Sequence, residues 1–267
     1  MLRALYSASS GMRAQQLNLD TISNNLANVN TTGFKRNRVD FQELLYATLR
    51  PPGQATRNGG TIPTGIQVGH GVRSVATPTD FSQGSLKETG NSLDLSIEGK
   101  GFFSVLLPDD TVAYTRDGSF KMDGEGYLVT SNGHYVLDER LSEIYISDEP
   151  VRSIIISPEG IISVQHPDGD EFVGVAQLGL TRFPNPTGME KIGRNLFKPT
   201  EAAGFETTGL PLEEGFGSIN QGFLEMSNVQ VVVEMVDMIQ AQRAYELSSK
   251  AINTSDEMLQ IANNLKR

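Results

Sequence analysis

Few residues in this sequence are arranged as a catalytic or metal-binding site would require. The three histidines, His70, His134 and His166, are far apart, and none has a His or Glu partner at the spacing found in helical zinc sites. Lys100 lies between glycines in GKGFF, yet a phosphate-binding loop needs a glycine where Asp94 stands. We therefore predict no catalytic residue, no metal site and no cofactor.

Two acidic segments that contain glycine have the oxygen-rich composition of calcium-binding loops. DGEG at 123–126 and HPDGDE at 166–171 lack the spacing of an EF-hand and its glutamate at the twelfth position, so we interpret both as hairpin turns. The short basic cluster Lys35, Arg36 and Arg38 stands alone. We expect it to meet water or the acidic surface of a neighbouring chain rather than nucleic acid.

The composition excludes several classes of protein. The 267 residues carry 22 basic and 32 acidic side chains, a net charge of −10, which disfavours binding to nucleic-acid phosphates. Because there is no cysteine, there is no disulfide and no thiolate zinc site. No apolar run approaches the roughly 18 residues of a membrane-spanning helix. The first residues lack the apolar core of a signal peptide. We expect no direct membrane insertion and, if the protein works outside the cytoplasm, export without a cleaved signal peptide.

Both ends of the chain show the three-four spacing of amphipathic helices. Near the N-terminus the stripe is only half apolar, because serines and a glutamine interrupt it. At the C-terminus the spacing continues from Val233 to Leu265, and no Gly or Pro interrupts 227–265, which predicts a long helix. Partly apolar stripes of this kind need partners, so we predict that the two helices pair as a coiled-coil-like stalk. The alternative is two separate terminal helices on one globule.

Between the ends, the sequence is typical of short strands and loops. Apolar or alternating runs between 93 and 180 are separated by turn sequences such as RDG, SNG and SPEG, which predicts an antiparallel β domain. The stretches 46–71 and 184–222 contain many Pro and Gly residues and predict extended connectors. We therefore predict an elongated α+β protein in three parts: a terminal helical domain (1–32 plus 225–267), an extended connector domain with an insert at 46–65 (33–91 plus 183–224), and a β-rich outer domain (92–182).

Two long motifs at opposite ends of the chain point to a family. NNLANVNTTGFKR, from Asn24 to Arg36, resembles the N-terminal motif shared by flagellar basal-body rod and hook proteins. SNVQVVVEMVDMIQAQRAYELSSKAINTSDEML, from Ser227 to Leu259, resembles their C-terminal motif, although Gln230 stands where the family often has Asn or Asp. The stretch 99–133 is similar to the family's β domain. The resemblance therefore covers nearly the whole chain.

The resemblance implies a structural protein rather than an enzyme. The length and the insert at 46–65 favour the distal-rod branch of the family, whose subunits polymerise into a stiff helical tube that transmits torque from motor to hook. The implied location is the rod of the basal body, which spans the periplasm, and the implied export route is the flagellar type III apparatus. The implied partners are other copies of the chain, proximal-rod proteins, the hook protein and the ring proteins around the rod.

Two alternatives and a set of interface residues complete the prediction. The nearest alternative is a proximal-rod or hook subunit, and the alternative from another class is a monomeric binding module with a helical stalk. The predicted subunit-interface residues come from the two stripes and the two motifs: Leu5, Met12, Leu19, Asn24, Asn25, Leu26, Asn28, Gly33, Phe34, Val233, Val236, Leu247, Ala251, Met258, Ile261 and Leu265. The rod-straightening role implied for the insert concerns Tyr46, Pro51, Pro52, Gly53, Pro63 and Gly65.

Overall fold

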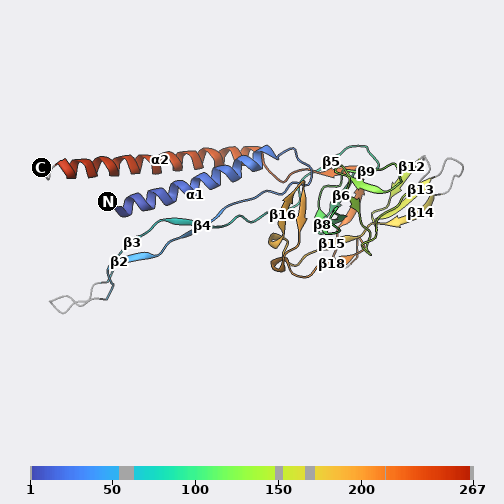
Figure 1. Ribbon diagram of the computed structural model, residues 1–267, viewed down its shortest axis with the longest axis horizontal. Coiled ribbons are helices and arrows are strands. Elements are labelled where there is room, and N and C mark those ends of the chain that lie inside the picture. Colours follow the sequence, from blue (N-terminus) through green and yellow to red (C-terminus); the bar gives the residue numbers. More distant parts are fainter. Residues whose placement is uncertain (1, 54–62, 148–152, 166–171, 214, 265–267) are drawn as a thin grey trace. The chain divides into compact units, whose positions relative to one another are not determined.

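The structure, a computed structural model, describes residues 2–53, 63–147, 153–165, 172–213 and 215–264 (Figure 1). It confirms the α+β class, with a helix at each end and a middle rich in strands. Contacts divide the chain into two units. Unit 1 comprises Met1–Ala27, Asn37–Thr79 and Gln230–Arg267, and unit 2 comprises Asn28–Arg36 and Asp80–Val229.

Unit 1 contains two long helices that pack side by side, α1 (Leu2–Ala27) and α2 (Val231–Asn264) (Figure 1). The helices are antiparallel, because Asn25 bonds Glu234 while Gly11, earlier in α1, faces Ser248, later in α2. A Cβ at Gly11 would lie 3.4 Å from the Ser248 Oγ, so a larger residue there would crowd the two helices. The interior of α2 has no Gly or Pro, which accounts for its length.

Two antiparallel ribbons complete unit 1. One joins β1 (Asp40–Glu43) to β4 (Val72–Ala76), and the other joins β2 (Tyr46–Arg50) to β3 (Ile66–Gly69). β4 contacts α1, where the Val72 amide donates to the Ser10 Oγ at 3.3 Å. A two-stranded ribbon is marginally stable alone, so the β2–β3 ribbon needs support from elsewhere.

Unit 2 is built from antiparallel strands. Its largest sheet has seven strands in the order β16-β17-β8-β7-β11-β10-β9, and a second sheet has three strands in the order β12-β13-β14. Three strand pairs, β5–β20, β6–β19 and β15–β18, and two short 3-10 helices complete it. The bounds are β5 Leu86–Glu88, β6 Leu95–Glu98, β7 Phe103–Leu106, β8 Val112–Thr115, β9 Phe120–Met122, β10 Leu128–Thr130, β11 Tyr135–Val136, β12 Ser153–Ile156, β13 Ile161–Gln165, β14 Phe172–Gln177, β15 Leu180–Arg182, η1 Pro186–Gly188, β16 Glu190–Gly193, β17 Leu196–Lys198, η2 Glu201–Ala203, β18 Thr207–Gly209, β19 Ser218–Gln221 and β20 Phe223–Glu225.

The core of unit 2 consists of two apolar clusters. The larger one gathers buried side chains from both sheets and from the β6–β19 pair, including Leu95, Phe103 and Ile162, none of which is exposed to solvent. The smaller one is aromatic and includes Phe102, Tyr114 and Phe183. Its rings meet edge to face, as aromatic pairs prefer.

Most of the predicted strands are present, and part of the predicted connector also forms strands. The runs predicted between 93 and 180 form β6 to β8 and β10 to β14, whereas 143–147 makes only isolated bridges. Within 183–224, predicted as an extended connector, β17 pairs with β8 and β19 pairs with β6. The contacts of one chain thus give two units, and the division into three parts at 92 and 182 remains a prediction.

Candidate assembly surfaces

The N-terminal motif, Asn24–Arg36, continues from the end of α1 into unit 2. Gly33 has a φ of +66°, which favours glycine. A Cβ there would lie 2.6 Å from the Asp117 backbone nitrogen, and the Gly33 amide donates to the Glu225 carbonyl at 2.8 Å. Gly33, predicted as an interface residue, is therefore already fixed by contacts within its own chain.

Lys35, two residues later, forms a buried ionic cluster. Its Nζ lies 2.6 Å from the Glu225 Oε1, and the Arg116 Nη1 lies 3.4 Å from the Glu225 Oε2. The Lys35 Nζ also donates to the Ser82 carbonyl at 2.8 Å, and the Gly84 amide donates to Glu225 at 2.9 Å. Burial lowers the pKa of Lys35 and of Arg116, and Glu225 opposes this effect in both. The expectation that Lys35 meets water or another chain is wrong, because its carboxylate partner lies in its own chain.

Asparagines of both motifs hold backbone groups of their own unit. In unit 1, the buried Asn25 side chain donates to the Asn37 carbonyl at 2.8 Å and to the Glu234 carboxylate at 3.1 Å, and it accepts from the Asn37 amide. In unit 2, the Asn228 side chain accepts from the Arg36 amide at 2.8 Å and donates to the Asp80 carbonyl at 2.9 Å. Asparagine suits both positions, because its amide both donates and accepts.

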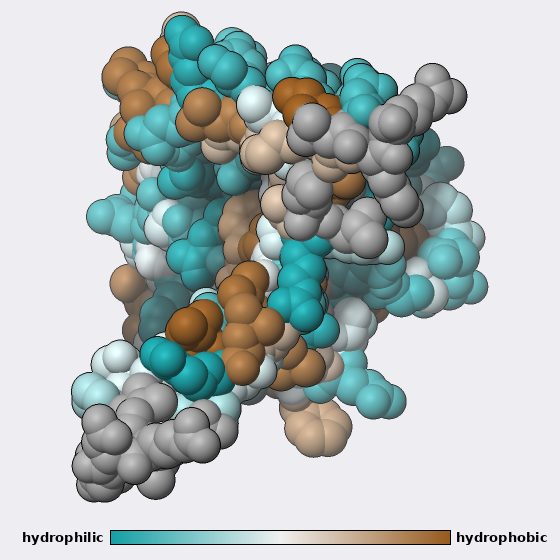
Figure 2. All heavy atoms as spheres, turned by 90° about the vertical axis from the view of Figure 1, so that its left-hand side faces the viewer, coloured by the Kyte–Doolittle hydropathy of each residue, from teal (hydrophilic) through white to brown (hydrophobic). Residues whose placement is uncertain are grey.

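Helix α2 has two distinct faces. The face buried at 3-4 spacing includes Glu234, Ala241 and Ser255, which are small or polar. The predicted stripe lies one position away. This second face is exposed. Ala251 is exposed on it, and so are its large apolar residues: Val232, Val233, Met235, Val236, Ile239, Leu247, Met258 and Ile261. We call these eight residues the outer stripe. Hydrophobic groups also reach the surface on the side of the molecule that Figure 2 shows.

The predicted interface residues on α1 and in the N-terminal motif differ in how far they are buried. Those predicted from the α1 stripe are half-buried: Leu5, Met12, Leu19 and Leu26. Asn24 is exposed and Asn28 is half-buried. Phe34 is half-buried in unit 2, where the Lys191 ammonium lies 4.9 Å from the centre of its ring. Leu265 lies outside the described residues.

The insert begins and ends in the β2–β3 ribbon, which is exposed on both strands. Tyr46, Leu49 and Ile66 are exposed apolar or aromatic residues. The Tyr46 hydroxyl donates to the Glu43 carboxylate at 2.7 Å, and this hydrogen bond raises the pKa of Tyr46. Pro51, Pro52, Gly53 and Pro63 are exposed, and a Cβ at Gly65 would meet the Arg50 carbonyl at 2.5 Å. Residues 54–62 of the insert lie outside the described residues.

The described residues hold no metal-binding group of three or more His, Cys, Asp or Glu side chains. None of the described helices is long and apolar enough to cross a membrane. The fold and its surfaces define an α+β protein whose strand unit has a closed core and whose helical unit exposes an apolar stripe suited to packing against other chains.

Three segments of the chain match known protein families. Residues 5–35 match the family described as flagella basal body rod protein, and residues 96–164 match the flagellar hook protein FlgE/F/G D1 domain. Residues 220–265 match the flagellar basal body rod FlgEFG protein C-terminal family. The chain belongs to the flagellar basal-body rod and hook protein family.

Full-length relatives agree with this assignment. The chain is 53% identical to the flagellar basal-body rod protein FlgG of Borreliella burgdorferi, with all of both chains covered. It is 41% identical to FlgG of Bacillus subtilis, again over the whole of both chains. It is also 32% identical over its full length to the flagellar hook-basal body complex protein FlhP of Bacillus subtilis.

Proposed function

We propose that the chain is a structural subunit of the distal rod of the bacterial flagellar basal body. The observation that carries this proposal is the full-length similarity to proteins named as flagellar basal-body rod proteins, at 53% identity in one case. The subunit would polymerise into a stiff helical tube that transmits torque from motor to hook. A structural role, rather than catalysis, follows for the chain.

The surfaces of unit 1 support a polymer. In the α1–α2 pair, the residues that α2 buries are small or polar, and the outer stripe of α2 stays exposed, which costs free energy unless other chains cover it. We propose that copies of the chain pack their outer stripes together, with the paired helices acting as a coiled-coil-like stalk. A head-to-tail interface that does not close generates an open helical filament.

The further partners are proposals of the same kind. They are the proximal-rod proteins below, the hook protein above and the ring proteins around a rod that crosses the periplasm. Export would proceed through the flagellar type III apparatus without a cleaved signal peptide. The exposed ribbon of β2 and β3 carries the insert, and we propose that this segment braces neighbouring subunits and keeps the rod straight.

Electron microscopy of basal bodies from a strain lacking this gene tests the proposal. A rod that stops short, with no hook attached, is the expected result. A complete rod that lacks only its hook would make the chain a hook subunit. Intact flagella would contradict the flagellar role.

Shortening the insert separates the distal rod from the proximal rod. Removing 51–64 should soften or curve the rod if the chain forms its distal part, and should affect the rod less if the chain forms the proximal part. Light scattering of the full chain tests the alternative from another class, because a monomeric binding module would stay monodisperse as its concentration rises.

A further inference from the structure

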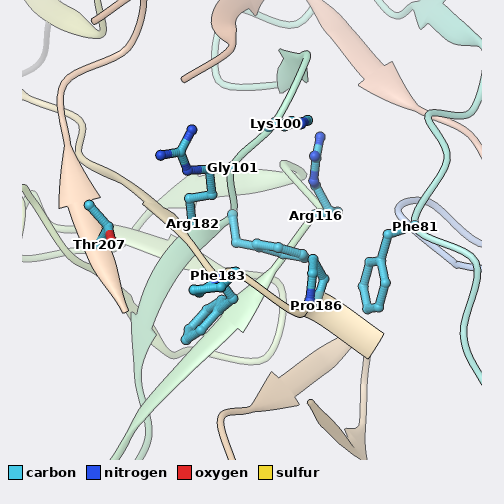
Figure 3. A pocket seen from close by; sticks show the side chains of 10 residues that line it. Phe81, Lys100, Gly101, Arg116, Arg182, Phe183, Pro186 and Thr207 are labelled. Carbon is cyan, nitrogen blue, oxygen red and sulfur yellow. The ribbon is translucent and has the colours of Figure 1, made fainter. Parts of the chain in front are cut away.

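A cavity of about 480 Å³ opens in unit 2, beside the segment that leads into β7 and the segment that follows β15 (Figure 3). Its volume is in the range of ligand-binding pockets. Lys100, Arg116 and Arg182 line it, and none of the described residues that line it is acidic. In Figure 3 the three cationic side chains lie in the upper half of the view, above Phe183 and Pro186.

One of the cations that line this cavity is buried. Arg116 shares the carboxylate of Glu225 with the buried Lys35, which Asp80 also attracts. The Arg116 Nη2 donates to the Gly99 carbonyl at 2.7 Å, but its buried Nε has no hydrogen-bond partner among the described residues. Because a buried charge without full compensation is costly, an anion entering the cavity would be stabilised. The chain as a whole carries −10, so this basic cavity is complementary to the rest of its surface.

The walls and rim of the cavity suit a peptide better than a small ion. The Phe81 and Phe102 rings meet edge to face with centroids 5.5 Å apart and provide an apolar wall. Phe205 is 95% exposed, between Gly204, which packs on Pro184 of the wall, and Thr207, which lines the cavity. The next residue, Glu206, accepts a hydrogen bond from the Tyr114 hydroxyl, which anchors this rim loop. An exposed aromatic side chain on an anchored loop is a typical binding anchor.

We propose that this cavity receives the acidic turn between β7 and β8 of a second copy of the chain in the assembled rod. The proposal rests on the polymeric function argued above. The turn presents Pro108, Asp109 and Asp110, all exposed, at the end of a hairpin. In the turns after β9 and β11, the carboxylates of Asp123 and Asp138 each accept two backbone amides of their own loop.

The turn between β7 and β8 exposes two adjacent carboxylates, those of Asp109 and Asp110, whereas the turns after β9 and β11 each expose one glutamate beside an aspartate that its own loop uses. The Asp110 carboxylate makes no hydrogen bond with the described residues, and Asp110 holds a φ of +58°. Asp109 accepts from the Thr111 hydroxyl at 2.8 Å, and this bond lowers the pKa of Asp109. An Asp110 carboxylate that enters the cavity would pair with its cations while Pro108 contacts the aromatic wall.

Charge exchange in cells tests the pairing. Lys100→Glu should reduce the number of complete rods per cell, counted by electron microscopy, at least tenfold, and Lys100→Glu combined with Asp110→Lys should restore it. Lys121→Glu is the matched control, because Lys121 is also exposed in unit 2 but lies outside the cavity. Thermal unfolding of the purified chains should be equal for Lys100→Glu and the control. Complete rods with Lys100→Glu, or no recovery in the double variant, would overturn the pairing.

Photocrosslinking from position 205 in assembled basal bodies identifies the occupant directly. The expected adduct has twice the mass of the chain and contains the 108–111 segment of a second copy, shown by mixing isotopically labelled and unlabelled chains. An adduct with a different protein, or with another segment, would overturn the assignment. The rod role would still stand in that case, because the strain lacking the gene tests it separately.

Discussion

Unit 2 and the helix α2 differ in how far their large apolar residues are buried. In unit 2, core residues such as Leu95, Phe103 and Ile162 are wholly removed from solvent by contacts within the chain. On α2, Leu247 is 69% exposed and Ile261 is 60% exposed, while the buried seam includes Ala241 and Ser255. Since apolar burial is the main favourable term in folding, unit 2 closes its own core, whereas the large apolar residues of the outer stripe on α2 are not covered by contacts within the chain.

The two terminal motifs are used in different ways within the chain. The residues around Gly33 and Lys35 are used inside unit 2, where they bind Glu225 from the C-terminal part of the chain. The eight large apolar residues of the outer stripe on α2 are exposed. Changes in the first group should therefore disturb the fold, and changes in the outer stripe should disturb assembly.

The largest effect is expected from removing the shared carboxylate. Glu225→Ala leaves Lys35 and Arg116 buried without their anion, and loss of one partner from a buried ionic cluster costs about 3–5 kcal/mol. We expect the free energy of unfolding, measured by urea denaturation, to fall by that amount. Glu88→Ala is the control, because Glu88 is exposed on the neighbouring strand β5, and its effect should stay within about 0.5 kcal/mol. Equal effects would show that the cluster is not a determinant of stability.

Leu247→Asp should separate assembly from folding. Each buried leucine contributes about 1.5–3 kcal/mol to an interface, and a carboxylate there adds a desolvation cost. We expect polymerisation, followed by sedimentation and electron microscopy, to be lost while thermal unfolding of the single chain is unchanged. Asn253→Asp on the same helix adds the same charge at an exposed polar position and should polymerise normally. A normal filament from Leu247→Asp would contradict the role of the outer stripe.

Larger side chains on α2 can test which face of this helix packs against α1. Ala241 is buried in α2, so Ala241→Leu should lower the free energy of unfolding of the single chain by about 1–3 kcal/mol. Ala251→Leu places the same side chain at an exposed position and should be nearly neutral in the single chain. The reverse ranking in urea denaturation would restore the predicted stripe as the face that α1 covers.

Much of the fold could be predicted from local patterns, because helices and strands leave periodic signals. The absence of Gly and Pro predicts α2, and the runs SIIIS and IISVQ predict β12 and β13. The side of α2 that meets α1 could not be predicted in this way. Spacing places large apolar residues on a stripe, but a close helix pair selects small residues such as Ala241, and these lie one position away.

The buried cluster had no local signal at all. Lys35 and Glu225 are 190 residues apart, and in the sequence Lys35 is one of several basic residues that follow Gly33. Only the three-dimensional contacts show that the lysine is wholly enclosed. Similarly, no spacing rule brings Lys100, Arg116 and Arg182 to one cavity, because they come from three separate segments of unit 2.

The smallest expected effect concerns Lys191, whose ammonium lies over the Phe34 ring and donates to the Lys35 carbonyl at 3.0 Å. Desolvation lowers the pKa of Lys191 from 10.5 to about 8. Between these values the unfolded chain binds more protons than the folded chain, so the free energy of unfolding should rise with pH from about 8 to 10.5. Lys191 is partly exposed, so the rise should be small.

Lys191→Met removes this titration but keeps Lys35 and Tyr114, whose pKa values are also shifted. The difference between the two pH profiles in urea denaturation therefore isolates Lys191. Across this pH range, the free energy of unfolding of the wild-type chain should rise more steeply with pH than that of the variant. Parallel profiles would show that the ammonium stays solvated, and that the N-terminal motif is less tightly packed in unit 2 than the Phe34 contact indicates.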